Sequence, residues 1–204
     1  MNLLAISGIA LAGTATAVAG AWYWSSTSVE QPEYTTITRD GPFELRSYPE
    51  LTLASIDAVG SRGSATRTSF SPLAEYIFAK QRGGEKIAMT APVTQQPVGE
   101  GWTVSFIMPA GRTVDDLPAP TGDVRLETVP ARTVAAVRFS GRWTDSVFGE
   151  QTEQLKRWMS SQRIQASDEP VFAYYNDPFT PAFLRRNEVL IEVEAGPGQT
   201  LTRQ

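Results

Sequence analysis

The chain has 204 residues, 18 Lys and Arg against 22 Asp and Glu, a formal net charge of −4, and neither Cys nor His. These two absences exclude disulfides, thiolate nucleophiles, Ser-His-Asp triads, HExxH metal sites and an imidazole ligand for iron. A hydrophobic fraction of 41% is typical of a globular protein, and the length suits one domain or two small ones.

The sequence also lacks the patterns of several other binding classes. It has no run of Lys and Arg, no Walker A or GxGxxG motif and no acidic calcium loop. Proteins that bind nucleic acid usually carry clustered Lys and Arg on one face. We therefore expect no nucleic acid, nucleotide or tightly held metal ion as a partner.

Residues 1–24 differ in composition from the rest of the chain. No residue from Leu3 to Trp24 is charged, and this stretch is close to the roughly 20 apolar residues that span a bilayer. It is either a signal peptide, with small residues around Ala17 for cleavage, or a membrane anchor with Trp22 to Trp24 at the interface. Both interpretations predict a periplasmic or secreted location, with or without an anchor in the membrane.

The remaining chain contains an internal repeat. A polar linker at residues 25–33 precedes it, and a Gly- and Pro-containing flexible tail at 195–204 follows it. The repeats cover about 34–109 and 122–194. FELRSYPELTLASIDAVG in the first and VRLETVPARTVAAVRFSG in the second each break at a proline, and a helix-like segment follows each.

Hydrophobic periodicity predicts one helix in each repeat. In the first, around residues 69–80, Phe70, Leu73, Ala74 and Ile77 recur at i, i+3, i+4 and i+7, with Pro72 in the first turn. In the second, residues 144–162, the helix begins behind Thr144 as its N-cap and has an imperfect apolar stripe.

Alternating apolar residues predict the strands. The pattern is clearest at Trp102, Val104 and Phe106 and again at Val189 and Ile191, and it predicts a sheet with one wet and one buried face. Two strand-strand-helix-strand-strand units favour an α+β fold, in which antiparallel strands form one sheet or an open barrel with a helix from each unit packed on it. The cleft between the two units is then the expected ligand site.

Two strings carry a family resemblance. KIAMTAPV at residues 86–93 and YNDPFTPAFLRRNEVLIEV at 175–193 closely resemble the SOUL or haem-binding protein family, and the match covers roughly residues 34–194. The resemblance implies two pseudo-symmetric repeats of antiparallel strands plus one helix each, forming a distorted, gyrase-inhibitor-like barrel. It also implies binding of haem or another tetrapyrrole in an apolar cleft, usually without catalysis.

A haem site needs a flat apolar slot, cations for the propionates and ideally an axial ligand. Phe70, Leu73, Tyr76 and Ile77 on the first helix, opposed by Tyr174, Tyr175, Phe179 and Phe183, are the candidates for the slot. The candidate cations are Arg62, Arg67, Lys86, Arg185 and Arg186.

The identity of the axial iron ligand is left open, because a His is proposed as the ligand in some family members and this chain has no His. Met89, Tyr76, Tyr174 and Tyr175 are chemically acceptable to iron, or the ring binds without a ligand. Each candidate also has a purely structural interpretation: the helix residues as core, Met89 as a core filler, the tyrosines as loop anchors and Arg185 as a solvated side chain.

Two other functions remain open at this stage. One is a hydrolase of small apolar electrophiles that uses Glu75 with Tyr76, or Glu150 with Tyr174, to activate water. The other is a membrane-tethered protein-interaction module with an apolar patch around Trp143 and Phe148.

Overall fold

A computed structural model describes residues 29–80 and 84–194 of the chain. The N-terminal segment 1–24 and the tail 195–204 lie outside the described residues. The elements in chain order are β1 (Thr35–Asp40), β2 (Phe43–Tyr48), β3 (Leu51–Val59), α2 (Arg62–Ile77), β4 (Val93–Val98), β5 (Gly101–Ile107), β6 (Arg125–Val129), β7 (Arg132–Phe139), α3 (Asp145–Ser161), β8 (Val171–Tyr174), the 3₁₀ turn η1 (Ala182–Leu184) and β9 (Asn187–Glu192).

Within the described ranges the strands form one nine-stranded sheet in the order β1-β2-β7-β9-β8-β4-β5-β3-β6, and all its pairs are antiparallel. The pairing has a twofold pattern. β2 of the first repeat pairs with β7 of the second, as β6 of the second pairs with β3 of the first, and β4 meets β8 in the centre. The two halves therefore share one sheet.

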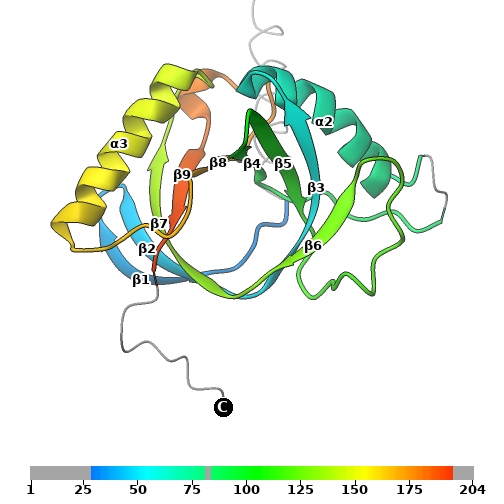
Figure 1. Cartoon of the computed structure of the whole chain (residues 1–204), viewed down its shortest axis with the longest axis horizontal. Coiled ribbons are helices and arrows are strands. Elements are labelled where there is room, and N and C mark those ends of the chain that lie inside the picture. Colours follow the sequence, from blue (N-terminus) through cyan, green and yellow to red (C-terminus); the bar gives the residue numbers. More distant parts are fainter. Residues whose placement is uncertain (1–28, 81–83, 195–204) are drawn as a thin grey trace, which may run out of the picture.

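The sheet is strongly curved but not closed (Figure 1). Its order begins at β1 and ends at β6, and β1 extends the first edge by pairing with β2. The expected α+β class is confirmed. The expected distorted barrel is corrected to an open curved sheet, because the described strands at its two edges do not pair with each other.

Both helices cover the outer face of the sheet, α3 on the left and α2 on the right in Figure 1. α2 packs on β3 and β5, where it encloses a core that includes Ala54, Leu73 and Phe106. α3 packs on β7 and β9 over a second core around Phe148 and Ile191. The alternating apolar residues of β5 and β9 thus face the helices as predicted.

Helix α2 begins earlier than the periodicity predicts. Its N-cap is Ser61, whose side chain accepts a hydrogen bond from the Ser64 amide, and Pro72 lies inside the helix rather than in its first turn. The first turns contain residues of low helix propensity. They are held instead by hydroxyl-to-backbone bonds, such as Thr66 Oγ1 to the carbonyl of Arg62 at 3.0 Å, and by tertiary contacts described below. Helix α3 begins behind Thr144 as predicted.

The inner, concave face of the sheet carries a buried network of charges. Arg46 on β2, with only 1% of its surface exposed, donates to Glu44 at 2.6 Å and to Glu188 on β9 at 2.7 and 3.2 Å. Glu188 also accepts hydrogen bonds from Arg186 and Tyr175. The expectation that one face of the sheet is wet holds only in part: curvature buries Ser105 and Glu188 on this face, whereas Thr103 and Glu192 stay partly exposed.

None of the described helices is long and apolar enough to cross a bilayer. The expected anchor or signal peptide, residues 1–24, is not among the residues that the structure describes.

The buried pair of Arg46 and Glu188 gives a stability prediction. Burial opposes ionisation of Glu188, but hydrogen bonds and charge from Arg46 and then Arg186 outweigh it and hold the pKa of this carboxyl below its ordinary value of 4.5. Glu188→Ala removes the carboxylate that pairs with the buried guanidinium of Arg46. We therefore expect the free energy of unfolding, measured by urea denaturation, to fall by about 3–5 kcal/mol.

The control for this prediction is Glu153→Ala, which removes an exposed partner of Lys156 on α3 and is expected to change stability by less than about 0.5 kcal/mol. Because the pKa of Glu188 is lowered by folding, its contribution is present above about pH 4.5 and is lost as the pH falls. A loss below about 1 kcal/mol for Glu188→Ala at neutral pH contradicts this account.

Candidate functional site

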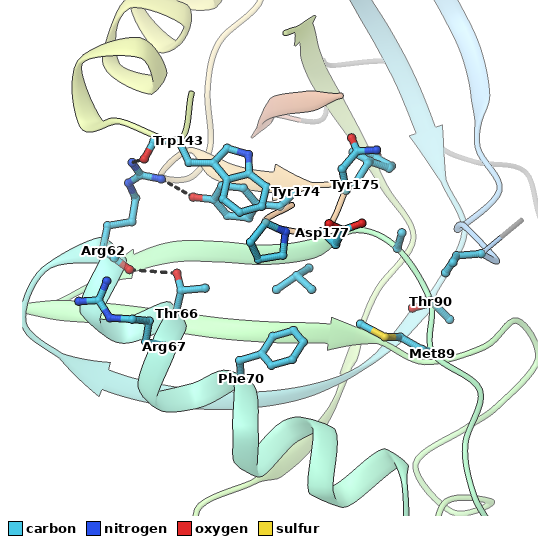
Figure 2. A pocket seen from close by; sticks show the side chains of 16 residues that line it. Arg62, Thr66, Arg67, Phe70, Met89, Thr90, Trp143, Tyr174, Tyr175 and Asp177 are labelled. Carbon is cyan, nitrogen blue, oxygen red and sulfur yellow. Dashed lines mark hydrogen bonds between the residues drawn. The ribbon is translucent and has the colours of Figure 1, made fainter. Parts of the chain in front are cut away.

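A cavity of about 590 Å³ lies between the first turns of α2 and the loop that follows β8 (Figure 2). Its wall combines residues of both repeats and of the segment before β4. The lining residues are Val29, Arg62, Gly63, Thr66, Arg67, Phe70, Met89, Thr90, Ala91, Val93, Trp143, Tyr174, Tyr175, Asn176, Asp177 and Pro178. The volume falls within the range of about 300–1,000 Å³ that is usual for small-molecule sites.

The face of α2 that lines the cavity is not the apolar stripe expected from the sequence. Arg62, Thr66 and Phe70 follow each other at i, i+4 and i+8 and face the cavity. Leu73, Tyr76 and Ile77, which the sequence placed in the slot, are buried in the core against the sheet. Of the four slot candidates on this helix, only Phe70 lines the cavity.

The opposite wall comes from the second repeat. Tyr174 and Tyr175 line the cavity as expected, and Trp143, which precedes α3, joins them. Met89 lines it from the segment before β4, with its thioether drawn toward the open space in Figure 2. Phe179 and Phe183, expected in the slot, are instead 86% and 76% exposed to solvent.

The candidate cations separate into two groups. Arg62 and Arg67 line the cavity, and among the described residues Arg67 has no ion-pair or hydrogen-bond partner. Arg185 lies over the Trp143 ring at 4.2 Å and donates to the carbonyls of Thr180 and Pro178, so it braces the loop behind the cavity wall. Lys86 and Arg186 are not lining residues; Lys86 is exposed, and Arg186 is paired with Glu188.

Arg62 joins the two repeats at the base of the cavity. From the first turn of α2 it donates to Asp145 at 2.6 Å, to the Trp143 carbonyl at 3.0 Å and to the Tyr174 hydroxyl. Its own carbonyl accepts a hydrogen bond from Gln95 at 2.9 Å, and Gln95 accepts one from the Tyr174 hydroxyl at 2.8 Å. The floor of the cavity is therefore a closed hydrogen-bond network.

This network affects the chemistry of the tyrosines. Burial raises the pKa of Tyr174 to about 12, although the charge of Arg62 acts in the opposite direction. Burial, followed by the charge of Glu188, also raises the pKa of Tyr175 well above its ordinary value. Both phenols are thus held neutral, while Tyr76 donates its hydroxyl to the Pro118 carbonyl away from the cavity. Of the sequence-predicted iron ligands, Met89 alone presents an uncommitted donor atom to the described cavity.

A second cavity of about 310 Å³ occupies the concave face between the halves. Its wall includes many polar side chains, among them Thr94, Thr103, Ser105 and Glu127. A cleft between the repeats therefore exists on both sides of the sheet, and the larger one, with Phe70, Trp143 and Tyr174 in its wall, lies on the helix side.

The residues of the other two functions occupy different surroundings. Neither Glu75 nor Glu150 lines the 590 Å³ cavity, and Tyr76 is buried in the core, so the described site does not bring the predicted Glu and Tyr pairs together. Phe148 is fully buried, and Trp143 is partly covered by Arg185. The prediction of an exposed patch around these two residues is wrong.

The cavity also contains residues that the sequence analysis missed. These are Val29, Gly63, Thr66, Thr90, Ala91, Val93, Asn176, Asp177 and Pro178. Most of these residues lie in the two strings at 86–93 and 175–193. The family-like motifs could therefore have located them, whereas hydrophobic periodicity could not.

Comparisons with known proteins show the family of the chain. Residues 29–192 match the family described as SOUL heme-binding protein. No curated protein matches the chain.

Several solved structures share the fold with TM-scores above 0.5. The EcmrR C-terminal domain superposes with a TM-score of 0.58 at 16% identity, covering 79% of this chain and 98% of that one. A hydrolase from Listeria innocua gives 0.55 at 12% identity, covering 78% and 94%. At these identities the likeness is one of fold alone.

The raised pKa of Tyr174 gives a spectroscopic prediction. At about pH 11, a phenol of pKa about 12 is only roughly one-tenth ionised, whereas an ordinary tyrosine is mostly ionised. Tyr174→Phe should therefore leave the phenolate absorbance of the folded protein at this pH almost unchanged. After unfolding in urea at the same pH, the substitution should lower the absorbance by the amount that one ionised tyrosine contributes.

Circular dichroism at the same pH verifies that both proteins remain folded. Since folding raises this pKa, the contribution of Tyr174 to stability is complete below about pH 10 and is lost as the pH rises toward about 12. Loss of one full phenolate signal from the folded variant at about pH 11 contradicts the proposed environment.

Proposed function

The chain belongs to the SOUL family of heme-binding proteins, and from this membership and the cavity we propose that it binds haem or a related tetrapyrrole between α2 and the loop after β8. The observation that carries the proposal is the wall of the 590 Å³ cavity. Phe70 on one side and Trp143 and Tyr174 on the other supply aromatic surface for a flat ring system. Such rings stack favourably against a planar apolar ligand.

Polar groups at the cavity fit the carboxylates of a tetrapyrrole. The exposed guanidinium of Arg67 lines the cavity and is free to pair with a carboxylate through two parallel hydrogen bonds. Arg62, by contrast, already uses its donors inside the protein. Arg67 is therefore the residue that we assign to the ligand's propionate.

The donors available to iron are few. The chain has no His, and the cavity's phenols are held neutral in hydrogen bonds. The thioether of Met89 is the candidate ligand that remains, and haem irons with Met ligands are known in proteins. In this proposal most of the affinity comes from apolar packing of the ring, and binding itself, as a buffer or carrier, is the activity.

The proposal places this activity outside the cytoplasm, in the periplasm or at a membrane surface. The support is the uncharged stretch from Leu3 to Trp24, which has the composition of a signal peptide or an anchor.

Gly63 allows a direct test of the site. It lines the cavity from α2, and a Cβ added there meets only Arg67 Nη1, at an ordinary 3.7 Å. Gly63→Leu should fill part of the cavity while favouring the helix, since Gly is the poorer helix former by up to about 1 kcal/mol. We expect at least about tenfold weaker hemin binding, measured by the Soret shift, with unchanged or higher thermal stability.

The matched control is Gly149→Leu on α3, where an added Cβ meets nothing within 4 Å and which is not a lining residue of the cavity. This variant should gain helix stability in the same way and bind hemin like the native protein. Native-like hemin binding by Gly63→Leu, or equal weakening by both variants, rules out this cavity as the site.

Arg67 allows a test of the carboxylate contact. Arg67→Gln should weaken hemin binding about fivefold because an exposed charge-assisted pair is lost, but should not affect binding of the dimethyl ester of hemin. The native protein and Arg67→Gln are each titrated with hemin and with its dimethyl ester, and the four dissociation constants are compared. Equal losses for the acid and the ester contradict the assigned role.

A further inference from the structure

The loop after β8 exposes large apolar side chains next to the cavity. Phe179, Phe183 and Leu184 are 86%, 76% and 51% exposed, and the same loop contributes Asp177 and Pro178 to the cavity wall. Phe70 and Met89, on the wall itself, are also more than one-third exposed. We call these five apolar residues the rim. Large apolar side chains that are exposed beside a cavity are typical of an interaction surface.

The loop has a defined conformation that holds these side chains outward. Asp177 accepts hydrogen bonds from the amides of Phe179 and Thr180 at 2.7 and 3.1 Å. Arg185 reaches back to the carbonyls of Thr180 and Pro178, both at 2.8 Å, and stacks on Trp143. The exposure of Phe179 and Phe183 is therefore built into the fold by specific contacts.

The N-terminal end of the described chain meets the same cavity. Val29 lines it and packs against Ala91 and Tyr175, and the Glu30 carbonyl accepts a hydrogen bond from the Ala91 amide at 2.8 Å. Residues 29–33, predicted as part of a linker, are thus fixed to the domain where they are described. The chain leaves the domain at the cavity wall.

The sequence upstream identifies the chemistry of the partner. The apolar part of the uncharged N-terminal sequence ends at Trp24, and only residues 25–28 separate it from Val29. Five residue steps span at most about 18 Å even when fully extended. If the stretch from Leu3 to Trp24 enters a bilayer, the cavity mouth is held within this distance of the aromatic residues suited to the interface.

We propose that the rim docks on a phospholipid bilayer, with the cavity mouth facing the lipid, so that an apolar ligand passes between membrane and cavity without crossing water. Exposed phenylalanine and leucine side chains gain free energy by entering the acyl boundary. The proposal concerns the orientation of the domain and holds whichever ligand the cavity binds.

The absence of Cys from the chain makes a clean experiment available. The full chain carrying Phe183→Cys or, separately, Leu184→Cys is labelled with an environment-sensitive nitrobenzoxadiazole probe and mixed with vesicles of equimolar phosphatidylcholine and phosphatidylglycerol. The matched control is Ile37→Cys, which is 47% exposed on the edge strand β1 and is not a lining residue of the cavity.

We expect the probes at 183 and 184 to shift to the blue with vesicles and to be quenched by nitroxide-labelled lipid, while the probe at 37 stays in water. Equal spectra at 183 and 37 on vesicle-bound protein overturn the proposal, as does a failure of the full chain to bind vesicles. A blue shift at 183 that grows with protein concentration without lipid also overturns it, because a second copy then covers the rim.

Discussion

The site depends on the burial of a single guanidinium, that of Arg62, at the junction of the two repeats. An uncompensated charge there is costly by several kcal/mol, so its partners must be in place together. These partners are Asp145 at the start of α3, the Trp143 carbonyl and the Tyr174 hydroxyl. By tying the first turn of α2 to the second repeat, Arg62 fixes the floor of the cavity and the spacing of its walls.

The two faces of the curved sheet carry different kinds of side chains. The concave face buries ion pairs around Arg46 and Glu188, and its smaller groove mixes polar side chains with apolar ones such as Leu53 and Leu190. The outer face carries both helices, and the 590 Å³ cavity lies there beside the first turns of α2, at Val93 of β4 and Tyr174 of β8. Because the repeats share one sheet, both contribute residues to the wall of this cavity.

Sequence reasoning succeeded where a pattern has one physical cause. Alternation located β5 and β9 because burial against the helices selects every second residue, and Thr144 was identified as a cap because it satisfies free amides. It failed for the first turns of α2, where tertiary contacts override low helix propensity. Sequence reasoning also chose the wrong face of that helix. The apolar stripe with Leu73 faces the core, whereas Arg62, Thr66 and Phe70 have helical spacing but mixed polarity, so hydrophobic periodicity does not detect them.

The central claim is that a tetrapyrrole lies between the helix side of the sheet and the loop after β8. A crystal structure of the protein grown with hemin tests it most directly. The account predicts planar electron density between the rings of Phe70 and Trp143, with a carboxylate beside Arg67. Density for the ring in the concave groove beside Thr103 and Ser105, or a cavity closed by the protein's own side chains, would contradict it.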